Sequence, residues 1–113
     1  MLDAKLQLKK GQKISLVGAP DKIAIAAGKS TETAADAVLV FVKNESELKK
    51  NLGRLQKSAR AGKLTWVAYP KAGQLDTDIN RDSLRAIANK NGLDPVRQIA
   101  IDDIWSALRL KAL

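Results

Sequence analysis

The tetrapeptide Gly28-Lys29-Ser30-Thr31 resembles the end of a phosphate-binding loop, in which backbone amides and a lysine hold a nucleotide's phosphates. The spacing does not fit that motif. Its first glycine would fall on Ile23, and the nearest glycine before the tetrapeptide is Gly18. Only about five residues then separate Thr31 from the next expected strand, too few for the helix that the motif requires. We interpret the tetrapeptide as a polar connection.

Side chains with oxygen atoms alternate farther along the chain, at Asp76, Asp78, Asn80 and Asp82. In calcium-binding loops, oxygen ligands at every second position converge on the ion. Here Arg81 stands where that loop needs glycine, and Ile87 stands where it needs a bidentate glutamate. We therefore expect Asp78 or Asn80 to cap a helix, and we predict no metal site.

Six basic residues follow one another with no acid among them: Lys49, Lys50, Arg54, Lys57, Arg60 and Lys63. On a helix they lie away from the leucine stripe. Such a face could contact a phosphate backbone, and Lys50, Arg54 and Lys57 are the candidates for contact with nucleic acid. The simpler interpretation is a solvated helix whose cations complement the dipole at its C-terminal end.

The net charge of +8 is divided evenly between the two halves of the chain, so there is no basic arm. The chain contains neither histidine nor cysteine. This removes the commonest general base, thiolate chemistry and any disulfide framework. We predict no catalytic residue and no cofactor.

Length and composition predict one domain over residues 1–113, since 113 residues of which 45% are hydrophobic suffice for one core. The absence of cysteine suits a reducing compartment, so we expect the cytoplasm. The first eleven residues lack the apolar stretch of a signal peptide, and no apolar run approaches the roughly 20 residues of a membrane span.

The elements that must position these residues can be inferred from apolar patterning. Apolar runs predict strands over 13–17, 37–42, 64–69, 96–101 and 107–110. Helical periodicity between a capping residue and a glycine predicts helices over 44–62 and 81–91. The link over 102–106 is too short for a parallel crossover, so the last two strands should pair antiparallel. Residues 21–33 fit a short strand or a helical turn, and we favour the turn.

This alternation predicts an α/β fold: a three-layer Rossmann-like sandwich with a mostly parallel sheet of about five strands and a C-terminal antiparallel strand. In such sheets ligands bind outside the carboxyl ends of the strands. The candidate ligand-binding residues at this rim are Gly18, Lys71, Thr77, Asp78, Arg81, Asp102 and Trp105. The charges of Lys71 and Arg81 would suit an anion near the start of a helix.

A resemblance adds to this interpretation. The segments 66–71, 77–78, 80–82, 101–103 and 105–109, together with 18–20 and 36–39, resemble an uncharacterised family of small bacterial proteins. The second half of the chain is also similar to the C-terminal half of class I methyltransferases. This implies a reduced methyltransferase-like fold with the spatial strand order 13–17, 37–42, 64–69, 107–110, 96–101, in which only 107–110 runs antiparallel.

The N-terminal half departs from the methyltransferase pattern, because Gly18-Ala19-Pro20 replaces the glycine-rich loop and no second strand ends in an acid. We therefore predict no tight binding of S-adenosylmethionine. The expected function is a non-enzymatic domain that binds a small anion or a protein partner through the rim, with no membrane contact. The alternatives are a small methyltransferase-like enzyme and a weak, non-specific nucleic-acid-binding module.

Overall fold

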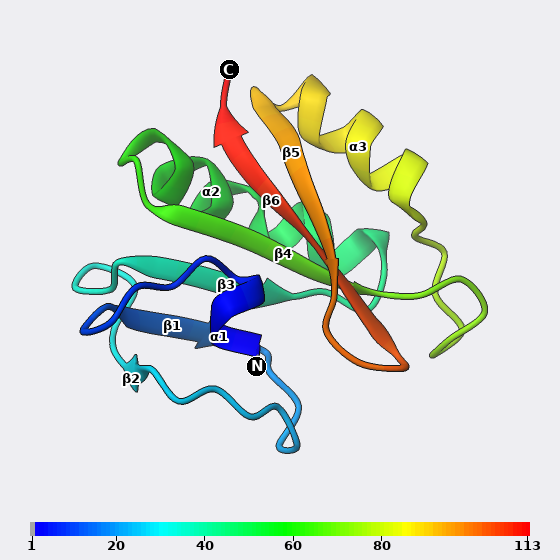
Figure 1. The fold of residues 1–113 in the computed structure, drawn as a ribbon. Helices are drawn as coiled ribbons and strands as arrows, with labels where there is room; N and C mark the ends of the chain where they lie inside the picture. Colours follow the sequence, from blue (N-terminus) through cyan, green and yellow to red (C-terminus); the bar gives the residue numbers. More distant parts are fainter. Residues whose placement is uncertain (1) are drawn as a thin grey trace.

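A computed structural model describes residues 2–113, which form one mixed six-stranded sheet and three helices (Figure 1). The strands are β1 Lys13–Val17, β2 Gly28–Lys29, β3 Ala37–Phe41, β4 Leu64–Pro70, β5 Leu93–Ala100 and β6 Trp105–Ala112. The helices are α1 Leu2–Lys5, α2 Glu45–Arg60 and α3 Arg81–Lys90. Their order across the sheet is β2-β1-β3-β4-β6-β5.

The predicted spatial order of the five main strands is confirmed. β6 is inserted between β4 and β5 and pairs antiparallel with both. β1, β3 and β4 are parallel neighbours, and β2 adds a two-residue edge strand within residues 21–33, where a short strand was the alternative to the favoured helical turn. The short link over 101–104 explains the hairpin, because the chain must reverse within a few residues.

The expectation of a mostly parallel sheet is wrong. One reversed strand in an interior position makes both of its pairings antiparallel, and these are the β4–β6 and β5–β6 ladders. Counted in paired residues, the antiparallel ladders form the larger share of the sheet, because β2 and β1 contribute only short parallel pairings.

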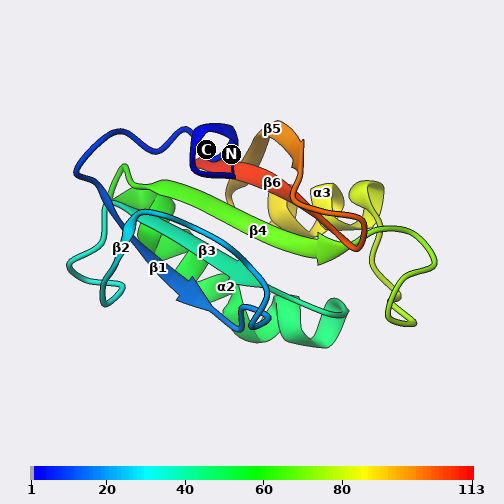
Figure 2. The same cartoon turned by 60° about the horizontal axis from the view of Figure 1, so that its bottom comes forward.

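The three-layer sandwich is not confirmed either. β3 alternates Val38 and Val40 toward the face covered by α2 and α3, and Leu39 and Phe41 toward the other face. Figure 2 shows α2 and the short α1 on opposite sides of the sheet. The second face has no layer of long helices. It is covered by α1 and by the segment that follows β1, with Leu6 fully buried there.

The helical turn favoured for residues 21–33 is wrong. Ile23 and Ile25 lie two residues apart in a segment without regular structure, and both pack on the second face of the sheet. The carboxylate of Asp3 accepts hydrogen bonds from the amides of Ala26 (3.0 Å) and Ala27 (2.9 Å). The segment is therefore held in place by packing on the sheet and by a partner from α1.

The two long helices begin where their capping residues predict. Asn44 accepts the amide of Glu47 through Oδ1 (2.9 Å), and the Glu47 carboxylate accepts the amide of Lys43. Asn80 and Ser83 form a reciprocal capping box at α3. Asn80, and not Asp78, is therefore the cap of that helix. Within residues 2–113 no helix combines the length and apolar character needed to cross a bilayer.

Candidate functional site

A hollow of about 310 Å³ lies at the carboxyl end of β4, beside the first turn of α3. We call it the rim pocket. The polar side chains that line it come from four segments of the chain: Tyr69, Lys71, Asn80, Arg81, Asp82, Gln98 and Ser106. Its position is the one that open α/β sheets use for ligands.

Strand register brings the floor of the rim pocket together. Tyr69 of β4 and Ser106 of β6 are direct cross-strand partners, so their side chains share the sheet face that α3 covers. Gln98 of β5 pairs with Leu108, which faces the same side. The side chains of Tyr69, Gln98 and Ser106 therefore meet on one face, although they lie far apart in the sequence.

The two cations of the rim pocket are positioned by backbone interactions. The amide of Lys71 donates to the carbonyl oxygen of Ile104 at 2.7 Å, which ties the end of β4 to the β5–β6 turn. Arg81 is the first residue of α3, whose start is fixed by the capping box of Asn80 and Ser83. The backbone of both residues is therefore fixed before any ligand arrives.

A chain of side-chain hydrogen bonds crosses the pocket. Arg81 donates through Nη1 to Oε1 of Gln98 at 3.3 Å, and Gln98 donates through Nε2 to the hydroxyl of Tyr69 at 3.4 Å. Tyr69 is only 3% exposed. Gln98, which is bound to the buried Tyr69, therefore orients the guanidinium of Arg81.

The electrostatics of the rim pocket favour an anion. Burial raises the pKa of Tyr69, although the charge of Arg81 and a hydrogen bond with Ser106 act in the opposite direction. The phenol therefore stays neutral at physiological pH. Asp82 is the one acid on the lining, with Oδ1 3.9 Å from Nε of Arg81 and a side chain 89% exposed. Lys71, Arg81 and the N-terminal end of α3 leave the pocket net positive.

The structure brings together only Lys71 and Arg81 of the seven predicted ligand-binding residues. Asp78 lies apart, because its Oδ1 accepts the amide of Glu45 at 2.8 Å, at the start of α2. Thr77 accepts the amide of Ile79 through its hydroxyl and shapes the loop before α3. Neither residue lines the rim pocket.

Asp102, Trp105 and Gly18 also serve the fold. Oδ1 of Asp102 accepts the amides of Ile104 and Trp105, both at 2.8 Å, and closes the hairpin turn. Trp105 is buried and meets Phe41 edge to face, with ring centroids 5.0 Å apart. Gly18 has φ +70°, and an added Cβ would lie 3.1 Å from the carbonyl oxygen of Phe41. We assign none of the three to the rim pocket.

Five polar residues line the rim pocket without being among the predicted ligand-binding residues: Tyr69, Asn80, Asp82, Gln98 and Ser106. The two-residue alternation of β4, which buries Val67 and Tyr69 on one face, was a usable signal for Tyr69. No comparable signal existed for Gln98, because a register shift between Pro95 and Arg97 decides on which face of the sheet the Gln98 side chain lies.

The basic face predicted for nucleic acid is partly neutralised. Arg54 has Nε 3.7 Å from Oε1 of Glu32, and Lys49 pairs with Glu45 at 3.0 Å. Lys50 and Lys57 are exposed and have no ion pair within the described residues 2–113. The outer face of α2 therefore offers fewer free cations than the sequence indicated.

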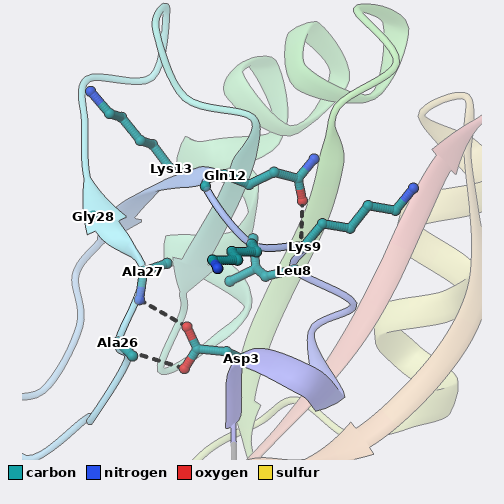
Figure 3. A pocket seen from close by; sticks show the side chains of 10 residues that line it. Asp3, Leu8, Lys9, Gln12, Lys13, Ala26, Ala27 and Gly28 are labelled. Carbon is teal, nitrogen blue, oxygen red and sulfur yellow. Dashed lines mark hydrogen bonds between the residues drawn. The ribbon is translucent and has the colours of Figure 1, made fainter.

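A second hollow, of about 380 Å³, lies at the amino end of β1 (Figure 3). Its side chains do not converge: the amines of Lys9 and Lys13 point in different directions, and the Asp3 carboxylate is engaged by two amides. Gln12 accepts the amide of Lys9 through Oε1 at 2.8 Å. We therefore do not assign a function to this hollow.

Across residues 2–113, no three side chains among histidine, cysteine, aspartate and glutamate cluster closely enough to hold a metal ion. Comparison with models of known protein families found no match, and comparison with curated proteins found none either.

Proposed function

We propose that this chain is a binding domain that takes a small oxyanion, such as a phosphate or a carboxylate, in the rim pocket. The observation that carries the proposal is the convergence of Lys71 and Arg81 on one hollow with the neutral hydroxyl of Tyr69. Two cations beside a neutral hydroxyl match the charge and hydrogen-bonding needs of an oxyanion. The link from Arg81 through Gln98 to Tyr69 reduces the ordering cost of binding.

The lining of the rim pocket favours binding over catalysis. Its titratable groups are two cations, a phenol whose pKa is raised, and the outward-facing carboxylate of Asp82. Among these residues there is no nucleophile held by a general base. We therefore propose a non-enzymatic role, in the cytoplasm, to which a chain without cysteine is suited.

The alternative of a small methyltransferase-like enzyme has less support. Such an enzyme needs a glycine at the end of β1 so that the backbone can approach the cofactor. Gly18 instead accommodates the backbone of Phe41, whose oxygen would lie 3.1 Å from an added Cβ. Membership of the methyltransferase-like group, and of the uncharacterised bacterial family, stays a prediction. Titration calorimetry with S-adenosylmethionine up to about 1 mM, where binding free energy is near 4 kcal/mol, tests the enzyme alternative.

The proposed site is tested by following backbone amides in NMR spectra during titration with phosphate, sulfate and citrate. We expect saturable shifts confined to residues 69–72, 80–82, 98 and 106. The variant Ala72→Trp places a large ring on the exposed edge of the rim pocket and should abolish them. The matched control Ala61→Trp, at an exposed alanine beyond α2, should retain them. Shifts centred elsewhere, or unaffected by Ala72→Trp, would refute the site.

A further inference from the structure

We propose a second binding site, for a small amphiphilic anion with an apolar body and a single carboxylate or sulfonate. It is a hollow of about 280 Å³ between α2 and the segment before β3, which we call the α2 groove. Its lining includes Glu32, Val38, Arg54, Lys57, Ser58 and Lys63. The volume is close to the lower end, about 300 Å³, of typical ligand sites. The proposal is independent of the rim pocket.

The outer wall of the α2 groove is held in place by α2 and the turn that follows it. Nζ of Lys63 donates to the backbone oxygens of Glu32 at 2.6 Å and Thr33 at 3.0 Å. Nε of Arg54 lies 3.7 Å from Oε1 of the same Glu32. These contacts fix residues 32 and 33 opposite the helix, so the groove exists without a ligand and little ordering cost is left for binding.

The lining of the groove suits an apolar group. Val38 closes the floor but is only 1% exposed, so the apolar surface that a ligand can cover is that of the aliphatic stems of Lys57 and Lys63 and the methyl group of Ala61, which line the same groove. The hydroxyl of Thr65 donates to the carbonyl oxygen of Lys63, so in the 2.6 Å contact with Ser58 the Ser58 hydroxyl is the donor. The hydrogen of Ser58 is therefore occupied. No free donor remains in that pair to hold a polar headgroup at the bottom of the groove.

The edge of the groove suits an anion. Arg54 and Lys57 are three residues apart on α2 and therefore lie on the same side of the helix. The amine of Lys63 is bound by neutral carbonyl oxygens, which leave its positive charge uncompensated. Glu32 is the only acid on the lining, against three cations. A headgroup at the edge would meet positive charge while the apolar body of the ligand lies against the aliphatic stems of Lys57 and Lys63.

The combination of an apolar lining and a cationic edge distinguishes the α2 groove from the rim pocket, whose donors suit a compact polar anion. Octanoate is therefore the probe for the groove, and inorganic phosphate and uncharged 1-octanol are the comparators. We expect octanoate to shift the amides of residues 32–33 and 54–61, with an affinity at least about tenfold above that of either comparator for the same amides.

Two variants locate the site. Ala61→Trp fills the mouth of the groove from an exposed position and should abolish octanoate binding, whereas Ala72→Trp at the rim pocket should leave it unchanged. Lys57→Gln removes one edge charge from an exposed site and should weaken octanoate about fivefold, with no change for 1-octanol. Unfolding curves show whether each variant is folded. If Ala61→Trp does not fold, Lys57→Gln alone still tests the site.

Three results would overturn the proposal. The first is 1-octanol binding at these amides as tightly as octanoate, which would mean that the cations are not used. The second is phosphate binding there as tightly as octanoate, which would mean that the apolar lining is not used. The third is octanoate binding that Lys57→Gln leaves unchanged.

Discussion

Nη1 of Arg81 lies 3.3 Å from Oε1 of Gln98, and this contact joins the first residue of α3 to the edge strand β5. Gln98 reaches on to the hydroxyl of Tyr69 in β4. A cation at a helix start is thereby oriented by two strands that meet only through β6. Preorganisation of this kind is what a binding site for a small anion requires.

The first prediction concerns Gly18, where the structure indicates a packing role. Gly18→Ala should destabilise the fold by about 1–2 kcal/mol, because φ is +70° and the new methyl group would crowd the carbonyl of Phe41. Urea unfolding measures the effect. Gly53→Ala is the matched control: Gly53 is exposed within α2 with free space around its Cβ position, so that change should stabilise by roughly 0.5–1 kcal/mol. An unchanged midpoint for Gly18→Ala would contradict the packing role.

Asp78 should contribute to stability and not to anion binding. Asp78→Ala removes the acceptor for the amide of Glu45 and should cost roughly 0.5–1 kcal/mol of unfolding free energy. Asp78→Asn keeps a side-chain oxygen there and should retain most of the stability. Thermal unfolding and a phosphate titration of both variants check this. If both variants lost phosphate affinity while their unfolding stayed unchanged, Asp78 would belong to the ligand site.

Asp3 predicts a dependence of stability on pH. Its pKa lies below the ordinary value of 3.8: burial opposes this shift, but hydrogen bonds from the amides of Ala26 and Ala27 and the charge of Lys29 outweigh it. Because the folded pKa is below the unfolded one, the carboxylate stabilises the fold above about pH 3.8, and this contribution is lost as pH falls through the folded pKa.

The measurement is urea unfolding of the protein and of Asp3→Asn at several pH values between about 2 and 6. The stability difference between them should be constant above about pH 5 and should shrink as pH falls below 3.8. A difference that grows on acidification would mean that the pKa of Asp3 is raised by folding.

Nucleic acid should bind weakly and without sequence preference. The exposed cations Lys50 and Lys57 can meet phosphates, but Arg54 is next to Glu32 and no aromatic side chain lies among them. Filter binding to short DNA should show affinity falling more than tenfold between about 50 and 200 mM salt. Sequence-selective binding that persists near 150 mM salt would favour the nucleic-acid function.

Much of the fold could be predicted because the signals for it are local. The apolar run of β3, the cap at Asn44 and the short link before β6 each determine an element or a connection by themselves. The cover of the second face could not be predicted in this way. Leu6, Ile23 and Ile25 pack there because no long helix covers this face. Its apolar side chains come together only when the sheet forms, so no local pattern shows that the face needs a cover.

The site was predictable to the extent that it depends on chain position. Lys71 follows a parallel strand and Arg81 begins a helix, so both could be assigned to the rim. Asp78 has the same kind of position, but its oxygen is satisfied by an amide 33 residues earlier in the chain. Gln98 enters the pocket through the bulged register of β5, which no local pattern reveals.

The most direct test of the anion site is titration calorimetry with inorganic phosphate on the protein and on three variants. Lys71→Gln and Arg81→Gln should each weaken binding about tenfold, or roughly 1.4 kcal/mol, because each removes one charged donor. Lys90→Gln, at an exposed site in the last turn of α3, removes the same charge far from the pocket and should have no effect. Equal losses in all three variants would mean that only net charge matters, and affinity unchanged in Lys71→Gln and Arg81→Gln would contradict the rim pocket as the binding site.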